Sequence, residues 1–268
     1  MHEHELNDAV HEVLKKLDQK EERAGAARGE QQSAGQPPTQ REETRGQGSP
    51  STDQTLRDEP TGQVEEIQQG MRGLDVSAVD PLRVQRSDLM RYSCELTLDT
   101  NTMNRNLKLS DNNRKVTLVM KEEQSYPDHP ERFDVCPQLL CRDGLTDRCY
   151  WEVETSGKVF ISVSYRGINR KGNSHDCLLG FNDQSWSLTC SDGFYFVRHN
   201  NIVANVSSSP TSGRVAVYVD CPAGSLSFYS VSSDSLIHLY TFNTTFTQTL
   251  YPGLGFFSDG SSVSLCPL

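Results

Sequence analysis

The stretch Cys149-Tyr150-Trp151-Glu152-Val153-Glu154 decides the fold of this chain. It leads through the turn Ser156-Gly157 into the run 158–165, in which every second residue is Val, Ile or Tyr. Apolar residues at alternate positions are typical of a strand with one buried face. We therefore expect two neighbouring strands here, joined by a tight turn.

Composition divides the chain at Tyr92. No aromatic residue occurs before that position, whereas residues 92–268 contain all 10 Phe, 9 Tyr and 2 Trp. A segment without aromatic side chains has little apolar area to offset the entropy of ordering. We predict a mostly disordered N-terminal region over 1–91, with one short helix, and one globular domain over 92–268.

The short helix is predicted over residues 5–22. Its apolar residues recur at spacings of three and four, which places them on one helix face; they are Leu6, Val10, Val13, Leu14 and Leu17. The stripe lasts under three heptads and favours a lone, marginal helix. Self-association through this helix, as the end of a coiled coil, and docking onto a partner are the alternatives.

Charge and hydropathy narrow the classes of partner. The chain carries a net charge of −10, with an acidic excess in both parts, and phosphate binding needs a basic surface instead. We therefore expect no nucleic acid. No run of 18 apolar residues is present and the N-terminus lacks the apolar core of a secretory signal, so we expect no membrane partner and a cytoplasmic location. In a reducing cytosol, the 8 cysteines are expected to be free thiols.

The domain reads as many short strands separated by Gly, Pro, Asn and Asp turns, which is typical of an all-β sandwich. The strands are expected at 95–99, 107–110, 115–119, 149–154, 158–165, 176–181, 185–190, 194–197, 214–220, 226–231, 236–242, 250–256 and 262–266.

At this point the residues resemble a known family. One block is similar to the PRY subdomain and consists of Leu96–Asp99, Leu107–Ser110 and Lys115–Val116. Four later blocks are similar to the SPRY part: Tyr150–Glu154, Ser185–Leu188, Arg214–Asp220 with Gly224–Tyr229, and Leu250–Gly253 with Gly260–Cys266. Five blocks in the right order make the resemblance specific. They assign PRY to about 92–145 and SPRY to about 146–268.

The resemblance is to the PRY-SPRY domains that end fish tripartite-motif proteins and fish NACHT leucine-rich-repeat (NLR) receptors. It implies a bent, two-sheet antiparallel β-sandwich, without enzymatic activity, whose loops on one face bind a protein partner. It also implies a place in cytosolic innate-immune or ubiquitin-linked signalling. The sequence departs from those architectures, since it shows no RING or B-box pattern, nucleotide-binding loop or leucine-rich repeat.

Catalytic signatures are missing from the sequence. His175-Asp176-Cys177 contains triad residue types, but neighbours in an expected strand point to opposite faces and cannot converge. No Gly-x-Ser-x-Gly elbow occurs. We expect no catalytic residue, no cofactor and no bound metal. The alternatives to a recognition module are a truncated or decayed paralogue with a structural role only, and a secreted toxin-like subunit, which native disulfides would support.

The candidate contact residues lie in four loops, because loops on a rigid sandwich commonly carry binding. Trp151 and Trp186 are expected to fill the core instead. Arg170, Lys171 and Phe257 are expected as the main anchors, since Arg and aromatic residues are enriched in binding hot spots. The full candidate set is Tyr126, His129, Arg166, Arg170, Lys171, His175, Asp192, Phe257 and Asp259.

Overall fold

The strand that contains the opening stretch, β5 (Arg148–Ser156), turns at Gly157 into β6 (Val159–Tyr165), and the two strands belong to different sheets. Gly157 has φ of +71°, and a Cβ there would lie 2.9 Å from that of Ser261. This connection needs glycine for both reasons. The computed structural model describes residues 83–191, 194–206 and 212–268.

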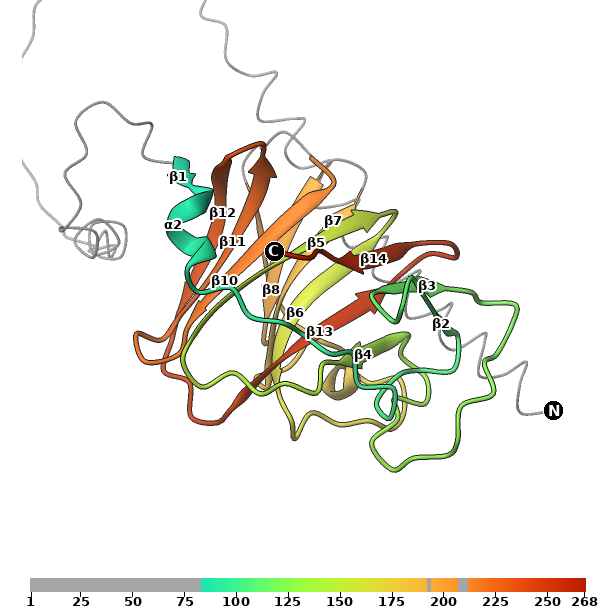
Figure 1. Cartoon of the computed structure of the whole chain (residues 1–268). Coiled ribbons are helices and arrows are strands. Elements are labelled where there is room, and N and C mark those ends of the chain that lie inside the picture. Colours follow the sequence, from blue (N-terminus) through green and yellow to red (C-terminus); the bar gives the residue numbers. More distant parts are fainter. Residues whose placement is uncertain (1–82, 192–193, 207–211) are drawn as a thin grey trace, which may run out of the picture. The chain divides into compact units, whose positions relative to one another are not determined.

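One sheet has eight strands and carries β5 near its middle (Figure 1). Its spatial order is β1 (Arg83–Gln85), β12 (Ser235–Asn243), β11 (Ser225–Ser232), β10 (Arg214–Asp220), β5, β14 (Ser262–Leu265), β3 (Lys115–Leu118) and β2 (Leu107–Ser110).

The second sheet has six strands and carries β6 near its middle. Its order is β4 (Gln138–Leu140), β13 (Leu250–Phe256), β6, β7 (Ser185–Ser191), β8 (Phe194–His199) and β9 (Ile202–Asn205). Every pairing between these named strands is antiparallel. The predicted all-β, two-sheet antiparallel sandwich is confirmed.

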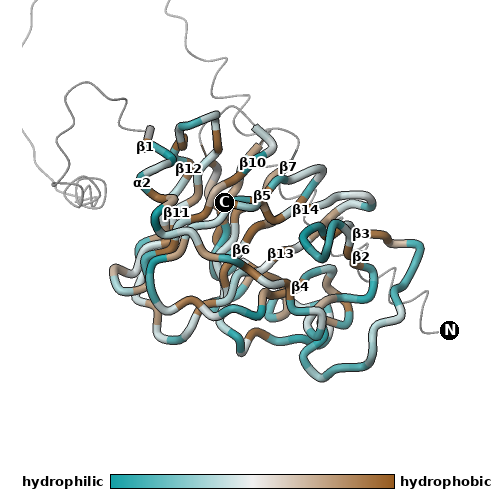
Figure 2. The backbone as a smooth tube through the Cα atoms, viewed as in Figure 1, coloured by the Kyte–Doolittle hydropathy of each residue, from teal (hydrophilic) through white to brown (hydrophobic). Residues whose placement is uncertain are grey.

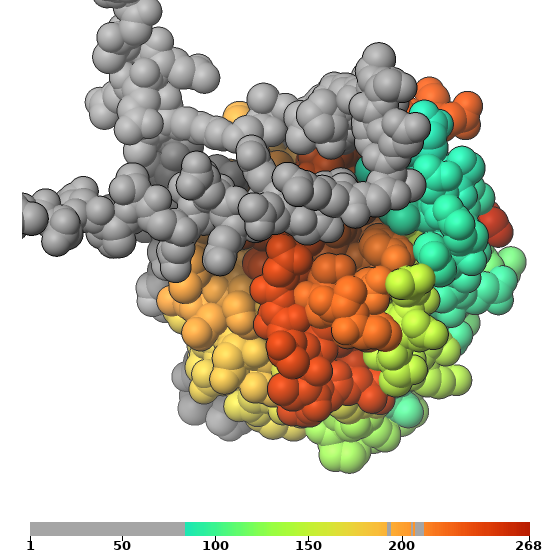
Figure 3. All heavy atoms as spheres, turned by 90° about the vertical axis from the view of Figure 1, so that its left-hand side faces the viewer, coloured from blue at the N-terminus to red at the C-terminus, as the bar shows by residue number. Residues whose placement is uncertain are grey.

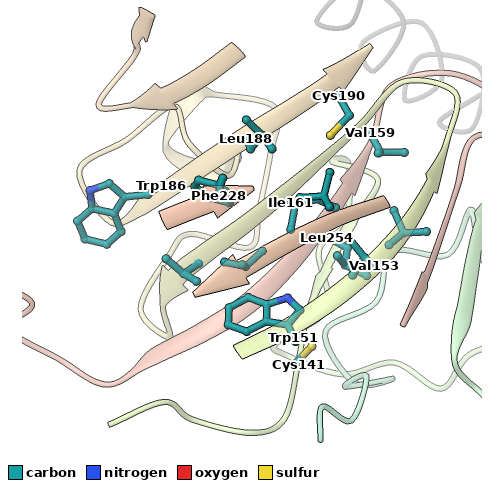
Figure 4. Close-up of a cluster of buried hydrophobic side chains, with 14 of the residues drawn as sticks. Cys141, Trp151, Val153, Val159, Ile161, Trp186, Leu188, Cys190, Phe228 and Leu254 are labelled. Carbon is teal, nitrogen blue, oxygen red and sulfur yellow. The ribbon is translucent and has the colours of Figure 1, made fainter. Parts of the chain in front are cut away.

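The main core lies between the two sheets. Trp151 from β5 and Trp186 from β7 are each 3% exposed, and both project into this layer together with Phe228 and Leu254 (Figure 4). The prediction that the two tryptophans fill the core is confirmed. Full burial of each large side chain contributes about 1.5–3 kcal/mol. Figure 2 shows hydrophobic residues along the strands and hydrophilic residues along the connecting loops.

A short arm precedes Tyr92, in a segment that the sequence did not mark as regular. β1 pairs with β12 and forms one edge of the eight-stranded sheet, and α2 (Arg86–Met90) follows β1. Val84 of β1 and Leu89 of α2 pack on a cluster of buried residues that includes Tyr150. The teal arm is visible beside the orange strands in Figure 3.

Two predicted strands are wrong. The first was predicted over 95–99, but residues 94–97 run extended without a ladder, and the segment is joined to its neighbours through isolated bridges at Ser93 and Leu98. Residues 176–181 do not form a strand, because a 3₁₀ turn, His175–Cys177, begins there and Gly180 has φ of +87°. Conversely, the short edge strand β9 was not predicted. The predicted N-terminal helix lies outside the described residues.

The prediction that all cysteines are free is wrong for Cys94 and Cys149, which form a disulfide across a Cα–Cα distance of 5.7 Å. The β-bridge between Ser93 and Tyr150 brings the two cysteines together, although Cys94 and Cys149 are 55 positions apart in sequence. Sequence spacing could not reveal such a pair. The six other cysteines are free, and four of these are buried.

Candidate partner-binding surface

Two long loops meet at one end of the sandwich, the first between β3 and β4 and the second between β6 and β7. The N–H of Gly172 donates to Asp134 over 2.9 Å, and the N–H of Asp134 donates to the carbonyl of Arg170 over 3.2 Å. Lys171 Nζ donates to the carbonyl of Arg132 over 3.2 Å. We call residues 126–134 and 166–175 the loop surface.

Arg166 binds two acidic residues from different segments of the chain. Its guanidinium donates to Asp99 over 2.9 Å and also pairs with Glu131. The hydrogen bond from Arg166 lowers the pKa of Glu131 below its usual range, and burial opposes that shift in part. The Arg166 side chain also lies over the Tyr251 ring, 5.2 Å from its centroid. Its contacts join loops to each other and to the sheet.

Arg170 is not the exposed anchor that was predicted, because its residue is only 8% exposed. The guanidinium donates to the carbonyls of Ile168 over 3.1 Å and Arg166 over 2.9 Å, and lies 4.6 Å from the Phe133 ring centroid. Burial, together with the nearby charge of Arg166, lowers its pKa to about 10. Arg170 shapes the loop from inside.

Phe257 is also buried, at 6% exposure, so the prediction of an exposed aromatic anchor is wrong. It packs on Phe160 with ring centroids 4.8 Å apart. Both belong to a second apolar cluster that includes Phe133 and Ile168 of the two long loops. The aromatic side chain therefore supports the loops from below.

The remaining candidates occupy varied positions. Tyr126 is half-buried and its hydroxyl donates to the carbonyl of Leu107 over 2.8 Å, while burial raises its pKa. Asp259 is exposed and accepts the N–H of Met120 over 2.8 Å, at the start of the first long loop. Asp192 lies outside the described residues.

Three candidates present accessible side chains at this end of the sandwich. His129 is half-buried, and its Nδ1 accepts the N–H of Glu131 over 3.2 Å. Lys171 and His175 are exposed, and the His175 ring lies 5.3 Å from that of Phe181. The structure thus brings together His129 and Lys171 from two loops far apart in sequence.

A hollow of about 470 Å³ opens on the loop surface and is lined by both His129 and Lys171. Its wall includes Arg132, which is 5% exposed and donates to the carbonyls of Thr100, Met103 and Pro127 over 2.9, 2.6 and 2.6 Å. Three carbonyl contacts fix the course of the proline-containing loop around that guanidinium.

Arg105 and Asp128 also line the hollow and form an ion pair of 2.5 Å. Arg105, Asp128 and Arg132 are not among the contact residues predicted from the sequence. The sequence gives little indication of their role, because charged residues in or near a loop with two prolines are usually expected to be exposed to solvent. Only the fold shows that Arg105, more than twenty residues before Asp128, closes the same hollow.

His175, Asp176 and Cys177 do not form a reactive site. The strand assumed for them is wrong, but Cys177 is fully buried and its thiol donates to the carbonyl of Lys171 over 2.8 Å. Burial raises the pKa of that thiol, which disfavours the nucleophilic thiolate. In the described part of the chain, no three His, Cys, Asp or Glu residues are arranged to hold a metal, and no helix is long and apolar enough to cross a membrane.

Comparison with known families agrees with the two-sheet fold. The model of the SPRY-associated domain, PRY, matches residues 96–145, and that of the SPRY domain matches residues 148–267. The chain belongs to the PRY-SPRY family. Domains of this family act as protein-binding modules in tripartite-motif proteins, and they are not an enzyme family.

Relatives of two kinds share the domain. The chain is 42% identical over 185 residues to neoverrucotoxin subunit alpha of Synanceia verrucosa, covering 68% of this chain and 26% of that protein. It is 34% identical to tripartite motif-containing protein 16 of Mus musculus, covering 62% and 30% respectively. The chain therefore spans only about a quarter to a third of these curated relatives.

A solved structure gives the same fold. The crystal structure of the TRIM65 PSpry domain superposes with a TM-score of 0.62 at 26% identity, over 73% of this chain and the whole of that one.

Proposed function

We propose that this PRY-SPRY domain recognises a protein partner through the loop surface. The main support for this proposal is the hollow between the two long loops. Side-chain hydrogen bonds from Arg132 and Lys171 to backbone carbonyls hold its walls in place. A surface that is ordered before binding loses less conformational entropy when a partner docks. Such preorganisation suits a recognition module.

The contact residues follow from accessibility. His129, Lys171 and His175 offer side chains to a partner, and Asp128 adds an exposed carboxylate on the rim. Arg166, Arg170 and the aromatic Phe257 act beneath the surface and hold its shape. Tyr126 contributes mainly through its carbonyl, which accepts a hydrogen bond from Arg105, and through its ring, over which the Arg132 guanidinium lies.

The test is a comparison of bait variants of the full chain in proximity labelling followed by mass spectrometry. The loop variant combines His129→Ala, Lys171→Ala and His175→Ala. The control variant combines Lys108→Ala, Ser110→Ala and Thr146→Ala, which are exposed but lie outside the loop surface. We expect the loop variant alone to lose the labelled partners. Equal labelling by the original chain, the loop variant and the control variant would refute the proposed surface.

The signalling context is part of the same proposal. Resemblance to the tripartite-motif relatives supports a role in innate-immune or ubiquitin-linked signalling in the cytoplasm. The matching test is to locate the labelled partners: cytosolic signalling proteins support the role, whereas exclusively extracellular partners contradict it. A decayed paralogue with a structural role only would label no partner above background.

A secreted toxin-like subunit is the second candidate function, because two observations favour it. Cys94 and Cys149 form a disulfide, and the neoverrucotoxin alpha relative shares 42% of the aligned residues. Disulfides persist in oxidising compartments. Expression of the full chain in cultured cells, with the protein measured in medium and lysate, separates the two. Recovery mainly from the medium, with the disulfide intact, favours the toxin-like role.

A further inference from the structure

A second hollow lies on the eight-stranded sheet and shares no lining residue with the loop surface. It is a groove of about 530 Å³. The extended segment 93–98 forms one wall, and the C-terminal residues 265–268 form the other. Trp151 and Leu265 also line it, but both are buried in the main core, at 3% and 9% exposure. Figure 1 shows the marked C end of the chain beside β5, the strand from which Trp151 and Glu152 line the groove.

Both walls are held against β5 by backbone hydrogen bonds. The N–H of Cys94 donates to the carbonyl of Tyr150 over 3.0 Å, and the N–H of Cys266 donates to that of Glu152 over 3.0 Å. The disulfide from Cys94 to Cys149 adds a covalent link to the first wall. The groove is therefore built from fixed segments rather than from a gap between mobile loops.

The first wall keeps free peptide groups. Within the described residues, the N–H groups of Glu95 and Leu96 donate no hydrogen bond, and their carbonyls accept none. The segment is extended, with Ser93, Glu95 and Thr97 exposed. Extended backbone with unused donors and acceptors can pair with another extended chain, as in β-strand addition.

Two arginines are among the residues that line the groove. Arg114 and Arg142 are exposed, and their side chains make no ion pair or hydrogen bond with the described residues. Their positions are nonetheless fixed, because the carbonyl of Arg114 accepts the N–H of Leu265 over 2.8 Å and the N–H of Arg142 donates to Thr97 over 2.8 Å. Two uncompensated guanidinium groups in an acidic protein complement carboxylates on a ligand.

We propose that this groove binds an extended acidic peptide of a partner protein. The peptide backbone pairs with the free peptide groups of residues 95–96, and its carboxylates contact Arg114 and Arg142. Glu95 is exposed on the wall and opposes such a ligand by charge. The binding is expected to weaken with added salt, because both arginines are exposed to solvent.

The test uses the full chain and a fluorescein-labelled synthetic peptide, Ser-Glu-Glu-Val-Glu-Glu-Ser, in fluorescence polarisation. Its counterpart has Gln in place of every Glu. We expect binding of the acidic peptide only, an affinity lower by about fivefold in Arg114→Gln and in Arg142→Gln, and a gain of about twofold in Glu95→Gln. Lys121→Gln is the matched control, since it removes one exposed charge outside the groove and should leave affinity unchanged.

Three results would overturn the inference: equal binding of both peptides, full affinity in the two arginine variants, or an equal loss in Lys121→Gln, which would indicate non-specific charge attraction. Thermal unfolding of each variant confirms that it folds. The loop variant with His129→Ala, Lys171→Ala and His175→Ala should bind the peptide normally. Failure of the groove is thus distinguishable from failure of the loop surface.

Discussion

Arg166 donates a 2.9 Å hydrogen bond to Asp99, a residue 67 positions earlier in the chain. The Asp99 side chain is only 4% exposed, and besides Arg166 it accepts the N–H of Asn101 over 3.0 Å. Because Arg166 also pairs with Glu131, one guanidinium joins the segment before β2 to both long loops. The shape of the loop surface, on which the proposed recognition depends, therefore rests on Arg166.

Arg166→Ala is expected to destabilise the domain by about 2–3 kcal/mol, because it leaves the buried carboxylate of Asp99 without its cation. Urea unfolding at neutral pH measures the loss. Arg142→Ala is the control, since Arg142 is exposed and its side chain is unpaired among the described residues, and it should change stability by less than about 0.5 kcal/mol. Equal effects of the two substitutions would contradict the role of Arg166.

Glu152 makes stability depend on pH. Burial raises the pKa of this carboxyl, but hydrogen bonds from Arg86 and Tyr150 and the charge of Arg214 outweigh burial, so its pKa lies below the usual range. A carboxyl with a depressed pKa stabilises the fold above its unfolded pKa of about 4.3, and this contribution is lost as pH falls through the folded pKa. Glu152→Gln should therefore cost about 3–5 kcal/mol at pH 7.

The check is urea unfolding of both proteins at pH 7 and at about pH 3. We expect the difference between the original chain and Glu152→Gln to shrink at the lower pH. A difference that stays constant would mean that the substitution acts through packing alone. Glu154→Gln gives the matched control, because the Glu154 side chain is 63% exposed and only a 3.8 Å contact with Arg214 links it to the cluster.

The sequence predicted the sandwich because alternation survives in the strands that pack on the core. The run 158–165 and the run at Arg214–Asp220 show it most clearly, and both form strands as expected. The prediction failed where a segment is held by contacts remote in sequence. Residues 94–97 alternate like a strand, but a disulfide and single bridges fix them instead of a ladder.

The candidate surface was less predictable than the fold. Two of the loops predicted to carry contacts meet in space, but residue type alone suggested that Arg170 and Phe257 were exposed. Because the loops pack on the apolar parts of both side chains, Arg170 is only 8% exposed and Phe257 only 6% exposed. Accessibility depends on which loop covers which, and that information lies in the tertiary contacts.

A turn at Gly180 stands where a strand was predicted over 176–181, and a substitution at Gly180 tests that turn. Its φ is +87°, and a Cβ would collide with the side chain of Ser187 on β7. Gly180→Ala is expected to destabilise the domain by about 2–3 kcal/mol through strain and overpacking. Gly167→Ala is the control, because a Cβ added at Gly167 would meet no neighbouring atom within 4 Å, and it should be neutral or slightly stabilising. Thermal unfolding compares them; a tolerant Gly180 would contradict the tight turn.

The disulfide between Cys94 and Cys149 gives a prediction about thiol number. Protein denatured without reductant should expose 6 thiols to maleimide, and reduction should raise the number to the 8 cysteines of the sequence. The bond closes a loop with a sequence separation of 55, so reduction is expected to cost up to about 4 kcal/mol in the chain-entropy view.

Cys94→Ser with Cys149→Ser should then reproduce the stability of the reduced chain and become insensitive to reductant. Cys221→Ser is the matched control, because this half-buried thiol is free and its loss should leave the response to reductant intact. Eight reactive thiols in the unreduced protein would restore the view that the chain is fully reduced. Because the first wall of the acidic-peptide groove carries Cys94, the same reduction should also weaken peptide binding, which links this bond to recognition as well as to stability.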